Sequence, residues 1–485
     1  MFRDKLLENS KYEGVDISDD SFYSSSAMVS KWSPHFALQL LTVINVKTGY
    51  SVVVPSINCG CNMSALGQFF RYKPLLLPLV AAAILFACDS DERVTPTDET
   101  VSSELNSPAI NSAVYQISKE STQELITNYL HLVDFGLAET ISQAIDLEET
   151  ISAFLLSPTV AGMEKVRDAW LLSHNTYEAA ELHRYVFKSL TKSAQDSVPD
   201  LLMDQLDYQI DHWPVLPGYI DYVEGYPESG VVSDINVSID KDNIREQHGY
   251  FDLAEAATGY HVLEFLIWGE NISGIGMRSF TDYEAALELT QEQIEAGLEV
   301  SQLSKNRRRL LLPVVAEILT DDLQEMQKLW TANKSMIANR LEEMSGPAMV
   351  NLLNEAIANM ITDELLVKSL YPLLNNDLAG SIQSPYSRST QNAVLAQLTG
   401  IEQIMREATN SDGKTFEELL ARISDDFVTS FFFNFDASKE CLALLYPAIQ
   451  RQVELDAAMN TEFGIVECIN LLNNLENILG EVSQL

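Results

Sequence analysis

A histidine and a glutamate lie three residues apart in an apolar stretch of this chain, "ATGYHVLEFLIWGE" at residues 257–270. If the stretch is helical, His261 and Glu264 share one face and their side chains can reach a common point. A neutral imidazole and a carboxylate at this spacing can bind the same cation, as Glu-x-x-His pairs do in di-iron helical bundles. We therefore predict that His261 and Glu264 are metal ligands, with at least one further ligand from elsewhere in the chain.

The neighbours of this pair are apolar on nearly every side of the expected helix. Residues 262, 263 and 265–268 are all apolar, a pattern typical of a helix that is buried around its whole circumference. A buried carboxylate costs free energy unless a cation or a hydrogen-bond donor pairs with it. Two interpretations follow: the pair makes a structural hydrogen bond, internally or with a neighbouring helix, or it binds a metal ion.

Composition restricts the classes of partner. The chain has 485 residues, with 31 Lys and Arg against 70 Asp and Glu, and a net charge of −39. Nucleic acids and anionic membrane surfaces bind clusters of basic residues, so this balance argues against both. The same negative charge attracts cations.

Helical periodicity dominates most of the chain. Apolar residues recur every three or four positions over long segments, such as residues 162–190 and 307–344. Alternating patterns typical of strands are scarce. The expected architecture is all-α, with two helical bundles in series, residues 108–275 and 276–485, and a break near residues 270–285.

The N-terminal region carries a targeting signal that begins well inside the chain. Residues 63–87 combine two basic residues, an apolar run and a Leu-Phe-Ala sequence directly before Cys88, which resembles a bacterial lipoprotein signal peptide. The apolar run is short for a transmembrane helix. We expect cleavage before Cys88 and lipidation of that cysteine, which would hold the protein at a membrane of the bacterial cell envelope, facing the periplasm or the cell surface. Residues 1–62 are interpreted as a non-native extension, and residues 88–107 as a polar tether.

Two cysteines follow Cys88 in the chain, Cys441 and Cys468. An envelope compartment permits a disulfide between them. Their positions in the sequence do not show that they meet.

Other charged pairs have ordinary structural explanations. His174 and Glu178 lie four residues apart, and so do His248 and Asp252; chance produces such pairs among so many acidic residues. We interpret both pairs as solvated helix faces. The triple arginine at 307–309 is interpreted as a solvated helix start.

The motif Gly259-x-His261-x-x-Glu264, with its apolar surroundings, resembles the signature of the imelysin-like family of bacterial envelope proteins. Further positions that agree with phrases of this family, in chain order, are Trp170, Tyr177, Glu181, Arg184, Trp213, Arg278 and Asp282. One position departs from the family's pattern, because His174 stands where we expect an arginine. The resemblance covers most of residues 108–485 and is strongest before residue 335.

The resemblance implies two four-helix-bundle-like domains that meet at a cleft, with the helix of His261 and Glu264 facing it. It also implies a part in iron uptake, alongside other envelope components, through binding of iron, another divalent metal or an iron-bearing ligand. Glu181 is then the best candidate for a third metal ligand; the alternative is an ion pair with Arg184 that braces two helices. The residues expected to support the ligands from around them are Arg184, Arg278, Asp282, Trp213 and Gly259.

The alternative function is a zinc-dependent envelope metallopeptidase, because His-x-x-Glu also occurs in zinc carboxypeptidases. Such an enzyme needs three protein ligands, an open position for water and a nearby acid or base. The chain contains no His-Glu-x-x-His motif. We therefore favour a metal-binding protein, with iron as the first candidate metal and zinc as the second.

If residues 63–87 are a signal peptide, protein made in bacterial cells starts at Cys88 and partitions with membranes. Cys88→Ser is expected to abolish labelling with a fatty-acid probe, because the thiol is the site of acylation. Mass spectrometry of the mature N-terminus checks the cleavage site. An intact, unlipidated protein that retains residues 1–62 would contradict this interpretation.

Overall fold

The computed structural model describes two short segments near the N-terminus and most of the chain from Ser118 onwards. The described residues are 44–46, 50–52, 118–192, 198–274, 276–375, 377–378, 380–407, 415–454 and 462–482. The predicted signal peptide, Cys88 and the tether at 88–107 lie outside these residues.

The chain divides into two compact units, residues 1–105 and 106–485. The described part of the first unit is a pair of antiparallel strands, β1 (Ile44–Val46) and β2 (Tyr50–Val52). Every named element in the described part of the second unit is a helix. The predicted all-α fold class is therefore confirmed.

The helices of the second unit, in chain order, are α3 (Lys119–Leu156), α4 (Val160–Ala179), α5 (Glu181–Lys192), α6 (Val198–Asp211), α7 (Pro217–Ile220), α8 (Gly230–Ser233), α9 (Lys241–Gln247), α10 (Tyr260–Trp268), η2 (Phe280–Tyr283), α11 (Gln291–Glu295), η3 (Val300–Gln302), α12 (Ser304–Glu343), α13 (Gly346–Met360), η4 (Ile361–Leu370), α14 (Tyr371–Leu374), α15 (Thr390–Arg406), α16 (Phe416–Ile423), α17 (Asp425–Glu454) and α18 (Glu462–Val482). None of these described helices combines the length and the apolar content needed to cross a membrane.

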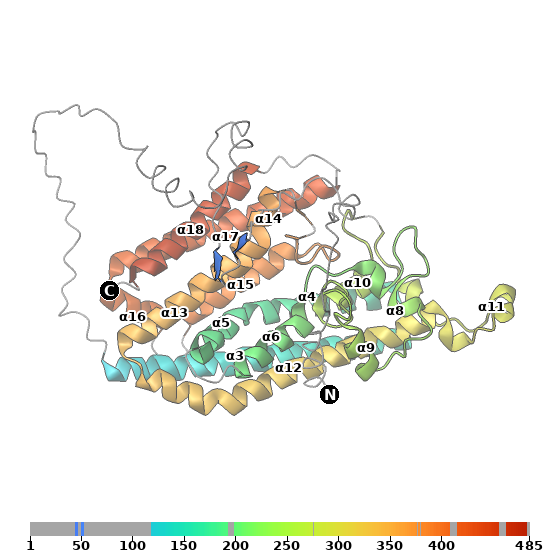
Figure 1. Cartoon of the computed structure of the whole chain (residues 1–485), viewed down its shortest axis with the longest axis horizontal. Coiled ribbons are helices and arrows are strands. Elements are labelled where there is room, and N and C mark those ends of the chain that lie inside the picture. Colours follow the sequence, from blue (N-terminus) through green and yellow to red (C-terminus); the bar gives the residue numbers. More distant parts are fainter. Residues whose placement is uncertain are drawn as a thin grey trace, which may run out of the picture. The chain divides into compact units, whose positions relative to one another are not determined.

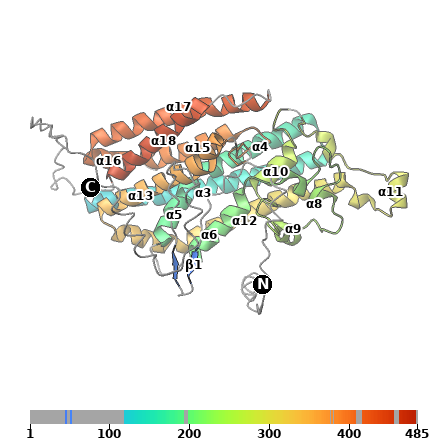
Figure 2. The same cartoon turned by 45° about the horizontal axis from the view of Figure 1, so that its top comes forward.

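Two long helices, α3 and α12, lie side by side in the second unit (Figure 1, Figure 2). The hydroxyl of Ser118 caps the start of α3 by accepting a hydrogen bond from the Ser121 amide at 3.1 Å. Buried apolar residues then recur along α3 at helical spacing and face the core. Trp330 of α12 donates through Nε1 to Asp134 of α3 at 2.9 Å, which joins the two helices across this contact.

The helices group by packing in a way that differs from the predicted domain boundary. α12 packs on α3 and α6, so it belongs with the N-terminal helices although it follows residue 276. Helices α13, α15, α17 and α18 pack on one another, and the contacts of α4 with α15 and of α5 with α13 join the two groups. The expected break near residues 270–285 therefore does not separate the packing groups, and residues 106–485 form one compact unit.

α4 and α15 approach each other closely at Gly400. A Cβ atom at this position would collide with the carbonyl oxygen of Ala179, the last residue of α4. Glycine removes that collision and permits the close crossing. As a result Gln397, one turn earlier in α15, reaches Glu178 and Glu181.

Cys441 of α17 and Cys468 of α18 form a disulfide. The bond ties together two helices that are 27 residues apart in the sequence. A covalent tie of this kind restricts the unfolded chain and stabilises the helical pair. Tertiary packing thus brings together the two cysteines whose pairing the sequence leaves open.

The predicted helix around the His-x-x-Glu pair is α10. All nine of its residues are buried, as its apolar pattern predicts. Gly259 and Gly269, with backbone φ angles of 96° and 68°, flank it at its two ends. The indole of Trp170 donates to the Tyr260 carbonyl oxygen at 2.9 Å and attaches the first turn to α4.

Gly259 also sets the position of α10 against the end of α6. A Cβ atom on Gly259 would lie 2.5 Å from the carbonyl oxygen of Ile210 and 2.7 Å from that of Gln209. Only glycine has the space and the backbone freedom for this approach. Because Asp211 is the next residue of α6, the approach carries its carboxylate towards His261.

His248, directly after α9, holds the segment that leads into α10. Its Nδ1 atom accepts hydrogen bonds from the amides of Ala257 and Thr258 at 3.3 and 3.2 Å. A ring nitrogen accepts only when it carries no proton, so these contacts require a neutral imidazole. Burial, together with the nearby His212 and Arg245, lowers the pKa of His248 to about 4.

Gly259→Ala is expected to lower the free energy of unfolding by roughly 3 kcal/mol or more, because the new methyl group meets backbone atoms of α6 and the left-handed backbone disfavours alanine. Urea or guanidinium unfolding measures the loss.

Gly297→Ala is the matched control. Gly297 is also left-handed, at φ 74°, but a Cβ atom there would meet nothing within 4 Å. The control is expected to lose only about 1 kcal/mol from the backbone. Equal losses in the two variants would show that the approach of Gly259 to α6 carries no special constraint.

The free energy of unfolding is expected to fall as the pH drops from 7 towards 4, because His248 titrates at a higher pH in the unfolded chain than in the folded one. In this window the unfolded chain binds a proton at the ordinary pKa of 6.5, whereas the folded chain binds it only near pH 4, so acid favours unfolding. His248→Asn keeps an acceptor near the Nδ1 position but cannot titrate. Between pH 7 and pH 5 the wild type should lose about 1–2 kcal/mol more than this variant. Urea unfolding at both pH values tests the difference, and parallel losses would refute it.

Candidate metal centre

Three helices bring two imidazoles and a carboxylate together in the interior. His174 lies on α4, Asp211 ends α6, and His261 lies in the first turn of α10. The Nε2 atoms of His174 and His261 lie 3.1 and 3.3 Å from the same atom, Asp211 Oδ1. One ligand atom from each residue lies within 4.8 Å of the other two. These three side chains, here called the His-Asp-His cluster, have the ligand types of a metal site.

Solvent does not reach the two imidazoles. His174 and His261 are each 1% exposed. The indole of Trp170 stacks on the His174 ring, with the ring centroids 4.7 Å apart. The Nε2 atom of His261 lies 3.3 Å from Asp211 Oδ1 and forms no hydrogen bond of standard geometry with a described residue. Buried polar atoms rarely remain in this state, so this nitrogen is a natural position for a cation to bind.

Glu264 orients His261 from the side away from Asp211. Its Oε2 atom accepts from His261 Nδ1 at 2.9 Å, and its Oε1 atom accepts from the amide and the hydroxyl of Ser387 at 2.7 and 2.8 Å. The carboxylate keeps a proton on Nδ1, so the lone pair of the neutral ring lies on Nε2, towards Asp211. Glu264, which we predicted as a ligand, therefore supports the histidine instead of joining the His-Asp-His cluster.

Glu178 lies against the other histidine. One of its oxygens is 3.1 Å from His174 Nε2, and the side chain is 0% exposed. Gln383 donates to the same oxygen, while Gln397 donates to the other at 2.8 Å. Gln383 also reaches Asp211 Oδ2 at 3.3 Å. The segment at residues 381–389 thus covers the cluster. Its Gln383 contacts Glu178 and Asp211, and its Ser387 contacts Glu264.

The carboxylates favour positive charge on the two imidazoles. Burial disfavours the charged ring of His174, but hydrogen bonds to Asp211 and Glu178 outweigh burial and raise its pKa to about 10. Burial also opposes charge on His261, and Asp211 and Glu264 outweigh it, so that its pKa is raised. For Asp211, burial works against ionisation, yet the two histidines hold its pKa well below the ordinary range. The centre therefore requires compensating positive charge, which protons or a metal cation can supply.

Glu181, the predicted third ligand, lies outside the His-Asp-His cluster. One of its oxygens accepts from Arg184 at 3.0 Å and the other from Gln397 at 2.8 Å. Burial and the neighbouring Glu364 raise the pKa of Glu181 well above its ordinary value, which disfavours the ionised form that binds metals. The pair with Arg184, our structural alternative, is observed, but both residues lie on α5, so it does not brace two helices. Arg184 Nε instead reaches Asp207 of α6 at 3.0 Å.

Arg278 and Asp282 brace the end of α10. Arg278 NH1 lies 2.8 Å from Asp221 Oδ2 and 3.6 Å from Asp282 Oδ2. Arg308 donates to both oxygens of Asp221, at 2.5 and 2.9 Å. The backbone amide of Arg278 donates to the Trp268 carbonyl at 2.8 Å. These residues support α10 through its C-terminal end, and not through contacts with the metal ligands.

Two predicted support residues remain, Gly259 and Trp213. Gly259 positions α10 against α6, as described above. Trp213 follows Asp211 by two residues and is partly exposed.

Three expectations of solvated side chains are wrong. His174 and Glu178 are buried because α15 and the 381–389 segment pack over this face of α4. Arg307 and Arg308 are buried as well, since backbone carbonyls and Asp221 pair with them. His248 and Asp252 share no helix face, because α9 ends before His248.

The sequence patterns do not single out Asp211, and they give His174 an ordinary structural explanation. Asp211 stands at the end of an ordinary amphipathic helix, and nothing in its neighbourhood distinguishes it from other acidic residues. His174 carried two signals: it lies in an apolar-rich helix four residues before Glu178, and it departs from the family's pattern. A buried polar pair on such a helix requires partners from other elements.

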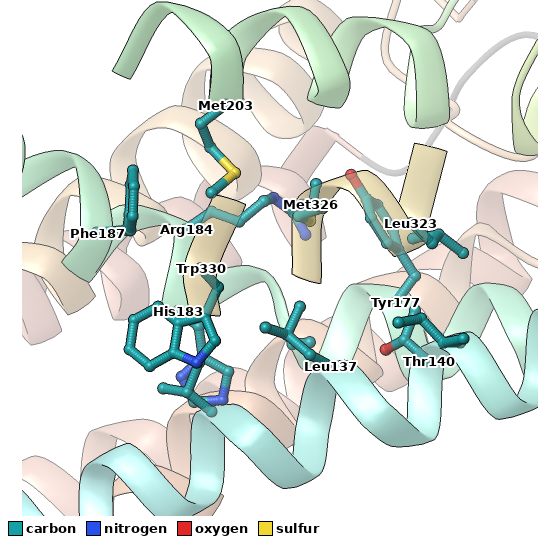
Figure 3. A pocket seen from close by; sticks show the side chains of 13 residues that line it. Leu137, Thr140, Tyr177, His183, Arg184, Phe187, Met203, Leu323, Met326 and Trp330 are labelled. Atoms are coloured by element: carbon teal, nitrogen blue, oxygen red, sulfur yellow. The ribbon is translucent and has the colours of Figure 1, made fainter. Parts of the chain in front are cut away.

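A separate small cavity lies between α3, α5, α6 and α12 (Figure 3). Leu137, Met203 and Met326 line it, with Arg184 at its wall. Its volume of about 30 Å³ holds roughly two water molecules at most. The cavity is therefore a packing defect beside the centre, not a binding site for a ligand.

Comparison with known proteins agrees with the resemblance drawn from the motif. Residues 136–467 match the family model Imelysin (peptidase M75). Two solved structures are similar to this chain. An imelysin-like protein from Psychrobacter arcticum has 13% identity and a TM-score of 0.48, covering 75% of this chain and 94% of that one. A "putative iron-regulated protein A precursor" from Parabacteroides distasonis has 14% identity and a TM-score of 0.49, covering 76% of this chain and 95% of that one.

No curated protein matches the chain. The family match spans more than half of the chain and includes the Gly259-x-His261-x-x-Glu264 motif and all three residues of the His-Asp-His cluster. This chain belongs to the imelysin family.

Proposed function

We propose that this protein binds one divalent metal ion, with iron favoured, at the His-Asp-His cluster, and that it does so in iron uptake at the bacterial cell envelope. The observation that carries the proposal is the convergence of two buried imidazole nitrogens on one carboxylate oxygen. A structural ion pair needs one partner for each group. The presence of three ligands of two types around one point is the arrangement that a metal ion requires.

The separations of the ligand atoms suit a single ion. Two atoms bound at about 2.1 Å to a tetrahedral ion lie about 3.4 Å apart. Asp211 Oδ1 is 3.1 Å from His174 Nε2 and 3.3 Å from His261 Nε2. The whole set spans at most 4.8 Å, so the cluster has room for an ion and none for a bulky iron-bearing ligand.

The donor set favours iron or zinc. Two imidazoles with one carboxylate form the ligand set of non-haem iron(II) sites, and zinc accepts the same types. A bound cation would neutralise the buried carboxylates. The protein's own residues then orient the ligands: Glu264 fixes the tautomer of His261, while Gln383 and Ser387 cover the centre from the 381–389 segment.

A zinc metallopeptidase is the second candidate function. It would use the same ligand set, but a peptide bond must reach the metal beside an open water position. Here both histidines are 1% exposed, and Trp170 and Gln383 cover the cluster. Metal binding requires only that an ion and its water enter, so burial favours the binding role.

Two features support a location in the cell envelope. The Cys441–Cys468 disulfide is typical of an oxidising compartment. The sequence before Cys88 has the order of a lipoprotein signal, and lipidation of that residue would tether the helical unit to a membrane. At this location the protein can meet other components of iron uptake.

Metal-free full-length protein is expected to bind one equivalent of Fe²⁺ or Zn²⁺ in anaerobic isothermal titration calorimetry, and the metal is expected to raise its melting temperature by mass action. His261→Ala and Asp211→Asn should each weaken binding at least about tenfold, because each removes a ligand atom. Circular dichroism confirms that the variants fold.

Two further variants sharpen this test. His131→Ala removes an exposed histidine of α3 and should bind metal like the wild type. Glu181→Gln should also retain binding, because Glu181 contacts Arg184 and Gln397 and lies outside the cluster. Equal metal stabilisation of the wild type and His261→Ala would refute the proposed centre.

A further inference from the structure

A second cavity borders the 381–389 segment, which also covers the His-Asp-His cluster. It has a volume of about 260 Å³ and is enclosed by this segment, the start of α15 and the last turns of α17. The residues that line it include Ile382, Arg388, Thr390, Tyr446, Ile449 and Arg451. Its size suits a small organic molecule.

The charge of this cavity is opposite to that of the chain. Arg388 and Arg451 line it, and none of its described lining residues is acidic. The whole chain, by contrast, carries 70 acidic and only 31 basic residues. A pocket with two arginines in so acidic a protein attracts anions that the rest of the surface repels.

Arg388 stands in an unusual backbone conformation. Its φ angle is 64°, and it is the one non-glycine residue with a positive φ among the described residues. This left-handed conformation costs an L-residue about 1–2 kcal/mol, which glycine would avoid. Gly274 leaves space for the guanidinium, because a Cβ atom there would lie 2.8 Å from Arg388 NH1. A side chain kept at such a cost points to a function of the arginine itself.

A hydrogen bond joins α15 and α17 beside this cavity. Pro447 interrupts the hydrogen bonds of α17, because it has no amide proton to donate to the Ala443 carbonyl. Gln391 of α15 donates to that carbonyl instead, at 2.9 Å. This bond fixes the start of α15 against α17, so the two arginines face a cavity of defined shape.

The cavity also offers an apolar surface. Ile382, Pro447 and Ile449 are apolar lining residues. A carbon skeleton can pack on the apolar part while acidic groups at its ends reach the donors.

We propose that this cavity binds a small organic anion with two or three carboxylate groups. The planar guanidinium of arginine pairs with a carboxylate through two parallel hydrogen bonds, and two arginines match two such groups. The apolar wall between them favours a carbon skeleton over inorganic phosphate. The inference goes beyond the proposed metal site and does not depend on it, although Arg388 directly follows Ser387, which covers Glu264.

Calorimetry and thermal melting of the metal-free, full-length protein test this site without any contribution from metal. The probes are sodium succinate and sodium tricarballylate at constant ionic strength, with succinamide as the neutral analogue and inorganic phosphate as the competing anion. We expect the carboxylates to bind and to raise the melting temperature, and succinamide to have no effect. Absence of carboxylate binding would overturn the proposal, and tighter binding of phosphate would overturn the assigned class of ligand.

Variants locate the site. Arg388→Gly and Arg451→Gln should each weaken carboxylate binding at least tenfold, while Arg388→Gly should be no less stable than the wild type without ligand, since glycine suits the backbone. Arg406→Gln is the control for loss of one positive charge, because Arg406 pairs with Glu402 and Glu417 outside this cavity. Binding that survives both test variants, or that Arg406→Gln weakens equally, would refute the site.

Discussion

The structure of the second unit depends on three carboxylates, two buried and one partly buried, that lie beside two buried imidazoles. Glu178, Asp211 and Glu264 lie within hydrogen-bonding or ion-pairing distance of His174 or His261. Removing such charge from water costs several kcal/mol for each ion unless it is fully compensated. The amides of Gln383 and Gln397 and the groups of Ser387 supply part of that compensation. Positive charge on the imidazoles or a bound cation can supply the rest, so the same constraint governs stability and the proposed metal binding.

Close helix crossings make this compensation possible. Gly259 lets α10 meet the last turn of α6, which brings Asp211 to His261. Gly400 lets α15 cross α4 at Ala179, which brings Gln397 to the buried carboxylates. Both glycines act by the absence of a Cβ atom. The centre is therefore assembled by packing distances between helices as much as by the choice of its polar residues.

The family motif has a physical meaning in this chain. Gly259 sets the helix contact, His261 supplies one nitrogen of the His-Asp-His cluster, and Glu264 fixes the ring tautomer that presents this nitrogen. The motif provides one member of the His-Asp-His cluster, and α4 and α6 provide the other two. One short phrase can thus identify the family while most of the site lies elsewhere.

The sequence by itself determined the all-α class, the buried helix at residues 260–268, the family and the shared helix face of His261 and Glu264. These follow from local patterns: apolar spacing, flanking glycines and the distance between His261 and Glu264 along one helix. Only the tertiary structure decided that Asp211 and His174 complete the cluster, that Glu181 pairs with Arg184, that α12 packs with the N-terminal helices, and that Cys441 meets Cys468. The physical reason is that each of these contacts joins residues from different helices, or from distant turns of the chain. The distances between these residues depend on how side chains of several helices pack together, and no single segment of the sequence encodes those distances.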